Sequence, residues 1–220
     1  MNNNDEFDNV IVKKGWGSEY LIFRNENLAI WLLSIDYNQE TSLHAHCLKQ
    51  TGLIVLDGIA KISFLNNSII LKGLDKIQIF NRRFHSTKSL SKRGTFLLEV
   101  ENPVDKHDLV RFKDVYGRVD KPYEGKEHHL IKDETCVWLE PNKNTELHNC
   151  NLIIKEISSK EEIFQQDFED MIVFLKGGII SKKNELIVCP GDVTSYSNIQ
   201  VLLEQFDISP NSMILFINKK

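Results

Sequence analysis

The sequence predicts an all-β protein made of two tandem jelly-roll barrels, the second of them degenerate. Three observations indicate this fold class. Short runs rich in Val, Ile, Leu and Phe alternate with turn-forming residues along most of the 220-residue chain. Four runs of the N-terminal half return in the same order in the C-terminal half, which is typical of an internal repeat. Only the first copy contains the histidine pair His44 and His46.

The N-terminal half reads as a series of strands in chain order. Val, Ile and Phe favour a pleated, half-buried surface, and Gly and Asp mark the turns between the runs. Residues 51–58 and 60–64 read as strand, tight turn and strand. The predicted strands are residues 28–36, 51–58, 60–64, 69–77, a run within 74–85 that ends in His85, and 94–100.

The C-terminal half repeats this order without the histidines. Residues 151–158, 170–177, 186–193 and 212–217 match 28–36, 51–58, 69–77 and 94–100. No histidine follows His148, so we expect the second copy to lack a metal site. Residues 158–168 begin with Ser-Ser-Lys-Glu-Glu, which resembles a capping box and predicts a short helix in place of the histidine-bearing strand. The alternative is one barrel with an elaborated C-terminal half.

His44 and His46 are the strongest indication of chemistry. Side chains alternate between the two faces of a strand, so positions 44 and 46 point the same way and can place two imidazoles on one metal ion. His85, about forty residues later, is the third candidate ligand. Three histidines would leave coordination positions open, as catalytic metal sites require. The alternative is three histidines satisfied within a barrel core.

The two motifs around these histidines resemble those of the cupin superfamily. The first cupin motif, H-x-H-x(3,4)-E-x(6)-G, is matched by His44, His46 and Gly58, with Thr51 at the usual glutamate position. The second is matched loosely by Asp75, Ile79 and His85, with Phe80 and Arg83 at the usual proline and glycine positions. The resemblance implies a cupin-like barrel that binds a divalent metal ion such as Zn, Mn, Fe or Ni. It predicts a metal-binding cupin barrel over residues 1–115 and a degenerate cupin-like barrel over 116–220.

Residues 13–22 add a narrower resemblance. They are similar to the R-P-W-G-x-Y segment that leads into the cupin domain of type II phosphomannose isomerases and related sugar-phosphate cupins, and they keep the pair Trp16 and Gly17. The similarity covers about residues 13 to 112. It implies that Trp16 contacts a sugar-phosphate substrate, and it is the only indication of a role in polysaccharide biosynthesis.

Charged and polar residues near the histidines are further candidates. Lys49, Arg82 and Arg83 would bind an anionic group, because arginine matches phosphate and carboxylate bidentately. A solvated loop is the alternative for the arginines. Glu99 and Glu101 alternate with Val100 and share one face of a strand, so either is a candidate base or fourth ligand if that face is the barrel interior. Gln50 is a further polar candidate for the catalytic site.

Together these features predict a metal-dependent isomerase or epimerase of a sugar phosphate or nucleotide sugar. A metal would hold adjacent sugar oxygens while a carboxylate or histidine moves a proton. Two alternatives stay open. An iron-dependent cupin dioxygenase would have a tight apolar pocket, and a non-catalytic sugar-binding or regulatory cupin would need no metal.

Composition narrows the class of partner. A net charge of −4 argues against a nucleic-acid binder, and no apolar run is long enough for a membrane span. The first residues lack the pattern of a signal peptide, so we expect a cytoplasmic protein. The four cysteines show no C-x-x-C spacing. We expect a small anionic carbohydrate ligand and, since cupins commonly pair through strand edges and barrel faces, a homodimer.

Overall fold

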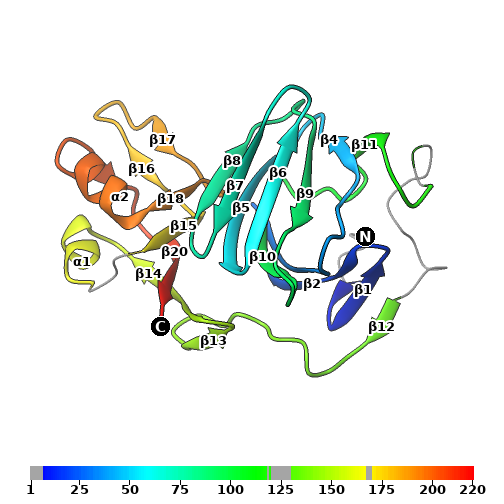
Figure 1. Ribbon diagram of the computed structural model, residues 1–220. Helices are drawn as coiled ribbons and strands as arrows, with labels where there is room; N and C mark the ends of the chain where they lie inside the picture. Colours follow the sequence, from blue (N-terminus) through cyan, green and yellow to red (C-terminus); the bar gives the residue numbers. More distant parts are fainter. Residues whose placement is uncertain (1–6, 118, 120–129, 167–169) are drawn as a thin grey trace.

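Two antiparallel sheets face each other in the N-terminal half of the computed structural model (Figure 1). The structure describes residues 7–117, 119, 130–166 and 170–220. The larger sheet has the order β12-β1-β2-β3-β10-β5-β8, with bounds β1 Val10–Lys14, β2 Gly17–Arg24, β3 Ala29–Ile35, β5 Gln50–Asp57, β8 Lys76–Ile79, β10 Thr95–Asn102 and β12 Leu130–Lys132. The smaller sheet has the order β11-β4-β9-β6-β7, with bounds β4 Leu43–Ala45, β6 Ile59–Phe64, β7 Ser68–Lys72, β9 His85–Ser89 and β11 Val110–Lys113.

The central strands of the larger sheet are buried on both faces. In β3, β5 and β10, odd-numbered side chains such as Trp31 and Leu53 point into the barrel and form its core. Their even-numbered neighbours, such as Leu32 and Ile54, point the other way and pack against the C-terminal half. This explains why these strands read as nearly continuous apolar runs, since alternation with polar residues is expected only where one face meets water.

The C-terminal half repeats the strand order of the first. Its larger sheet is β13-β14-β20-β15-β18, which corresponds to β2-β3-β10-β5-β8, and its smaller sheet β17-β16-β19 corresponds to β7-β6-β9. The bounds are β13 Thr145–Leu147, β14 Cys150–Ile157, β15 Met171–Lys176, β16 Ile179–Ile180, β17 Leu186–Val188, β18 Val193–Ser195, β19 Asp207–Ile208 and β20 Ser212–Lys219. The predicted all-β fold of two jelly-roll repeats is confirmed.

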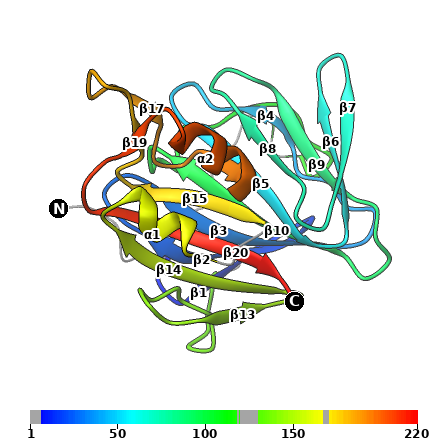
Figure 2. The ribbon, with the colours of Figure 1, turned by 90° about the vertical axis from the view of Figure 1, so that its left-hand side faces the viewer.

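Two short helices distinguish the second repeat. Helix α1, Lys160–Phe164, lies between β14 and β15, at the point where the first repeat has β4, so the predicted helix is confirmed. Helix α2, Tyr196–Leu203, follows β18. Figure 2 shows both helices over one face of the larger second sheet, where Ile163 and Ile199 are fully buried against Phe174 and Phe216. The helices therefore close a core that the small three-stranded sheet alone leaves open.

The two halves meet along the outer face of the first larger sheet. The Asn102 side chain donates to the Pro190 carbonyl at 2.6 Å, and the Val193 N–H donates to Gln78 at 3.1 Å. β12, C-terminal to residue 116, pairs with β1 of the first half. The division between residues 115 and 116 stays a prediction, because residues 118 and 120–129 lie outside the described part of the chain. Among the described residues, no helix has the length and apolarity needed to cross a membrane.

Candidate metal centre

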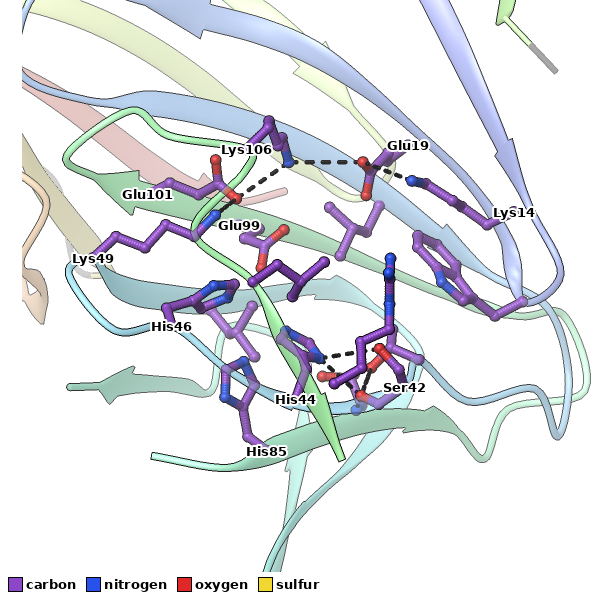
Figure 3. Close-up of a pocket in the computed structure, with 17 residues that line it drawn as sticks. Lys14, Glu19, Ser42, His44, His46, Lys49, His85, Glu99, Glu101 and Lys106 are labelled. Carbon is purple, nitrogen blue, oxygen red and sulfur yellow. Dashed lines mark hydrogen bonds and ion pairs between the residues drawn. The ribbon is translucent and has the colours of Figure 1, made fainter. Parts of the chain in front are cut away.

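Two neighbouring strands of the smaller sheet bring the three predicted histidines together. His44 on β4 lies directly opposite His85 on β9 in the antiparallel pair. Residues opposite each other in such a pair share a face, so both rings point into the barrel. His46 follows one residue after the end of β4 and keeps the same orientation. All three imidazoles therefore lie in one interior site, and the alternation argued from the sequence accounts for His44 and His46 (Figure 3).

The rings are close enough to share one ion. Their centroids lie 4.9 Å apart for His44 and His46, 4.4 Å for His44 and His85, and 5.6 Å for His46 and His85. One ring nitrogen from each histidine lies within 4.8 Å of the others. Zinc-to-imidazole bonds are about 2.0–2.1 Å, so one ion can reach all three with small side-chain adjustments.

Backbone carbonyls fix the tautomer of each ring. The Nδ1 of His44 is 2.8 Å from the Ser42 carbonyl, that of His85 is 3.0 Å from the Arg83 carbonyl, and that of His46 contacts the Asp108 carbonyl. A carbonyl oxygen only accepts, so Nδ1 carries the proton in every ring and Nε2 presents a lone pair. The Nε2 of His46 is buried without a hydrogen-bond partner among the described residues. Imidazoles held in this way fit a metal ion well.

Burial keeps the imidazoles uncharged. It is the main reason why the pKa of His46 falls to about 2 and that of His85 to about 4. The pKa of His44 lies well below its usual value, through burial first and the neighbouring imidazoles second. Metal ions bind only the neutral imidazole, so the three ligands need no deprotonation near neutral pH.

The site opens into a small, partly open cavity of about 70 Å³. Ligand pockets usually measure roughly 300–1,000 Å³, so this space holds an ion and a few waters but not a whole sugar. Its walls include the apolar side chains Trp16, Leu33, Leu53 and Leu109. Its polar lining consists of the three histidines with Lys14, Glu19, Thr41, Ser42, Lys49, Thr87, Glu99, Glu101, Lys106 and Arg111.

A row of buried lysines and glutamates lies beside the histidines (Figure 3). Lys49 and Lys106 donate to the same Glu101 oxygen at 2.7 and 3.1 Å. Lys106 also lies 3.6 Å from Glu19, which lies 3.5 Å from Lys14. The Lys106 ammonium sits 3.7 Å from the centre of the Trp31 ring. These contacts compensate charges that would be costly to bury alone.

The two glutamates of β10 titrate differently. Burial and the charge of Glu101 raise the pKa of Glu99 to about 7, and Lys106 and Lys49 only partly oppose this rise. Burial also acts to raise the pKa of Glu101, but Lys106 and Lys49 outweigh it and the net pKa is lowered. Glu101 is thus a fixed anion, and Glu99 can gain or lose a proton near neutral pH.

The structure brings only some of the other predicted residues to the cavity. Trp16, Lys49, Glu99 and Glu101 line it. The Gln50 side chain instead lies 3.4 Å from Asp192 of the second half, because it follows Lys49 and faces the opposite side of β5. Arg82 and Arg83 are exposed and line a separate surface hollow of about 490 Å³ with Phe64, Phe84 and residues 65–67. Thr51, at the usual glutamate position, faces the interior opposite Glu101 but does not reach the cavity.

Several cavity residues were not predicted. Glu19 follows Gly17 on β2, and pairing with Leu33 places it in the barrel interior. Lys106 and Arg111 come from the segment after β10, in which the sequence predicts no site residue. The alternation of side chains along residues 17–24 weakly predicts that Glu19 points into the barrel. No sequence pattern predicts the direction of the Lys106 side chain, because its segment is irregular and has no strand periodicity.

Comparisons with known proteins find partial structural likenesses at low sequence identity. No family model matches the chain, and no curated protein matches its sequence. Among solved structures, KdgF from Halomonas sp. is similar over 44% of this chain and 82% of its own, at 11% identity and a TM-score of 0.38. The capsular polysaccharide assembling protein CapF from Staphylococcus aureus matches over 47%, at 15% identity and a TM-score of 0.43, and this chain spans only 34% of it.

A third similar structure is a conserved protein with a double-stranded β-helix domain from Klebsiella pneumoniae. It matches over 52% of this chain and 97% of its own, at 15% identity and a TM-score of 0.42. The strand order of the first repeat and the histidines on β4 and β9 define a barrel of the cupin type. The jelly-roll barrel that the cupin resemblance implies is present in this topology, and its histidine cluster could hold a metal ion.

Proposed function

We propose that this protein is a metal-dependent cupin enzyme of the isomerase or epimerase type, acting on a small anionic carbohydrate. A sugar phosphate or nucleotide sugar is the proposed substrate class. One observation supports the proposal most: three uncharged imidazoles present Nε2 to one cavity beside Glu99, whose pKa is about 7. His44, His46 and His85 would hold the divalent ion, whether Zn, Mn, Fe or Ni.

The bound ion would polarise a substrate carbonyl and so acidify the neighbouring C–H group. Glu99 is the group that would remove this proton and return it to the adjacent carbon. A carboxyl with a pKa near the working pH does this best, and such a group contributes about 10²- to 10⁴-fold in rate. Glu101 is held as an anion by Lys49 and Lys106, so it stabilises the site's charges and does not shuttle protons.

The size of the cavity restricts how a sugar binds. About 70 Å³ admits the reacting end only, so the rest of the substrate must extend through the mouth. The hollow beside Arg82 and Arg83 is a suitable place for an anionic group. Phe64 lies next to both sites, because it is opposite His85 in the β6–β9 pair and its ring centre lies 5.7 Å from the Arg83 guanidinium carbon. The role in polysaccharide biosynthesis rests on the sequence resemblance alone.

The test combines metal content with proton exchange. Wild type, Glu99→Gln and the double variant His44→Ala/His46→Ala are purified, loaded with Zn, Mn, Fe or Ni, and analysed by elemental mass spectrometry. Each is then incubated in D₂O with a panel of sugar phosphates and nucleotide sugars, and deuterium incorporation is followed by NMR. We expect one metal ion and exchange in wild type, metal without exchange in Glu99→Gln, and neither in the double variant. Stoichiometric metal in the double variant, or exchange by Glu99→Gln at the wild-type rate, contradicts the proposal.

An iron-dependent dioxygenase is the second candidate. The small cavity, with Trp16, Leu33 and Leu53 in its walls, favours it. Two further features agree: Glu101 already binds the Lys49 ammonium, and Arg82 and Arg83 lie outside the cavity, so these cations are not placed to bind an anionic substrate there. Such an enzyme would bind Fe(II) preferentially and consume oxygen with its substrate, which an oxygen electrode measures. Protein without metal after reconstitution would support a non-catalytic ligand-binding barrel. Cytoplasmic location and a homodimer stay predictions, and sedimentation velocity checks the latter.

A further inference from the structure

One segment of the first barrel, after β10, crosses back to the metal site. We call residues 103–113 the crossing segment. It leaves β10 at Asn102, supplies Lys106, Leu109 and Arg111 to the cavity wall, and ends in β11, which pairs with β4 beside His44. The segment belongs to neither of the two sequence motifs, yet it forms part of the site.

Asp108 fixes the crossing segment to the turn after His46. Its carboxylate accepts hydrogen bonds from the N–H groups of Cys47, Leu48 and Lys49 at 2.7, 2.8 and 2.8 Å. The Asp108 residue is only 8% exposed, so these bonds are partly shielded from water. Three backbone donors on one carboxylate form a strong, directional anchor, because bonds to an ionised acceptor are about twice as strong as neutral ones.

The same residue also orients a ligand. The Asp108 backbone carbonyl accepts the Nδ1–H of His46, whose Nε2 is the buried nitrogen without a partner. The carboxylate thus holds the backbone on both sides of this contact: residue 108 itself, and residues 47–49 that follow the histidine. Any loosening of the anchor moves the carbonyl that sets the tautomer and direction of the His46 ring.

We propose that Asp108 is a positioning residue of the metal centre, and that metal binding at His44, His46 and His85 is coupled to docking of Asp108 on residues 47–49. The inference rests on the proposed metal site. Coupling is reciprocal, so a variant that loosens the anchor weakens metal binding, and a bound metal tightens the anchor by the same factor. Loss of a residue that supports a metal ligand typically weakens metal affinity by about 10- to 100-fold.

The crossing segment offers a matched control. Asp105 lies three residues before Asp108, and its Oδ1 accepts the N–H of His107 at 2.8 Å. It makes the same kind of local bond without touching the turn after His46. Asp108→Asn removes the charge and turns an amide N–H₂ toward backbone donors. Asp105→Asn makes the same chemical change at a position where the anchor is unaffected.

The experiment uses Co²⁺, whose visible absorption reports the ligand geometry. Metal-free wild type, Asp108→Asn and Asp105→Asn are titrated with Co²⁺ after circular dichroism and thermal unfolding have shown that each is folded. We expect Asp108→Asn to bind at least tenfold more weakly with a changed spectrum, and Asp105→Asn to match wild type within twofold. A folded Asp108→Asn with the wild-type Kd and spectrum overturns this inference and leaves the metal site standing. A wild type that binds no Co²⁺ overturns both.

A second measurement needs no variant. Amide hydrogen exchange is compared in the wild-type protein with and without Zn²⁺. Coupling predicts that exchange at Cys47, Leu48 and Lys49 slows at least tenfold on metal binding, while the His107 amide, bonded to Asp105, changes little. Zinc bound stoichiometrically without slower exchange at residues 47–49 overturns the inference even if Asp108→Asn does not fold.

Discussion

Glu99 and Glu101 show how two identical side chains, two positions apart on one strand, acquire different roles. Both are buried, and both face the barrel interior on β10. Glu101 has two ammonium groups within 3.1 Å, whereas Glu99 forms no ion pair with any described residue. The lysines therefore stabilise the anion at Glu101, and the anion at Glu101 in turn disfavours a second one at Glu99. Carboxyls whose pKa values are pushed apart in this way are typical of acid–base sites.

Glu99 also predicts a pH dependence of folding. Its folded pKa of about 7 exceeds the model-compound value of 4.5, so the folded state holds a proton that the unfolded state has released, and stability falls as pH rises between these values. Glu99→Gln removes this loss. From pH 5 to pH 8, metal-free Glu99→Gln should gain about 2–3 kcal/mol in unfolding free energy relative to wild type.

Urea unfolding at both pH values measures this difference. The comparison with wild type matters, because the three histidines change stability in the opposite direction over part of the same range. Their folded pKa values are lowered, so the unfolded state binds more protons below about 6.5 and stability falls as pH decreases. Wild type and Glu99→Gln both contain the three histidines, so this effect cancels in the stability difference between them. An equal stability difference at pH 5 and pH 8 would contradict the raised pKa of Glu99.

For single residues, the alternation of side chains along a strand determined which members of the site could be predicted from the sequence. The period of two explains why His44 and His46 share a face, whereas His85 joins them through the pairing of β4 with β9. The same period, counted from Lys49, shows that Gln50 must face away from the cavity. Arg82 lies in the turn between β8 and β9 with a φ of 61°, where alternation does not apply and proximity to His85 in sequence does not give proximity in space.

At the scale of single elements, the start of β2 shows why a glycine follows Trp16. Trp16 is buried and lines the cavity, and the chain must then turn into a strand that pairs with β3. Gly17 does this with a φ of 141°, and a Cβ there would lie 2.0 Å from the Ser34 carbonyl oxygen. In the sequence, Trp16 and Gly17 stood out only because they resemble the W-G pair of the segment that leads into sugar-phosphate cupin domains. The physical reason, close approach of two backbones, is visible only in the pairing of β2 with β3.

Gly17→Ala should therefore destabilise the protein by about 2–4 kcal/mol, since both the φ angle and a backbone clash oppose the new methyl group. Gly73→Ala is the control, because no atom of the described residues lies within 4 Å of a Cβ there. It should change stability by less than about 0.5 kcal/mol. Thermal and urea unfolding of the two variants measure the difference. Equal stabilities would show that β2 begins differently from the structure described here.

At the scale of the whole molecule, the two repeats share one apolar core. Leu32, Ile54 and Leu98 of the first repeat pack with Leu152 and Leu215 of the second. The repeat itself was predictable, since each strand match is local in sequence. The shared core was not, because the even-numbered apolar residues of β3, β5 and β10 show that a second face is buried but not what covers it. The same contact places Gln50 and Asn102 against residues 190–192, directly behind Lys49 and Glu101.

A shared core predicts that both repeats unfold together. Val193 on β18 is 7% exposed and lies against Gly52, where an added Cβ would meet its side chain at 2.4 Å. Val193→Asp would bury an unpaired carboxylate between the repeats and should lower the unfolding free energy by about 3 kcal/mol or more. Val201→Asp is the control, since Val201 on α2 is 61% exposed. It should leave stability within about 0.5 kcal/mol of wild type.

Calorimetry with hydrogen exchange distinguishes joint from separate unfolding. If the repeats unfold together, Val193→Asp keeps a single transition at a lower temperature, and amides of β3 and β14 lose protection to the same extent. If the barrels were independent, the amides of β3 would keep wild-type protection and a second transition would appear. Joint unfolding would mean that the second repeat stabilises the one that holds the histidine cluster, because β5 and β10 keep their second buried face only while both repeats are folded.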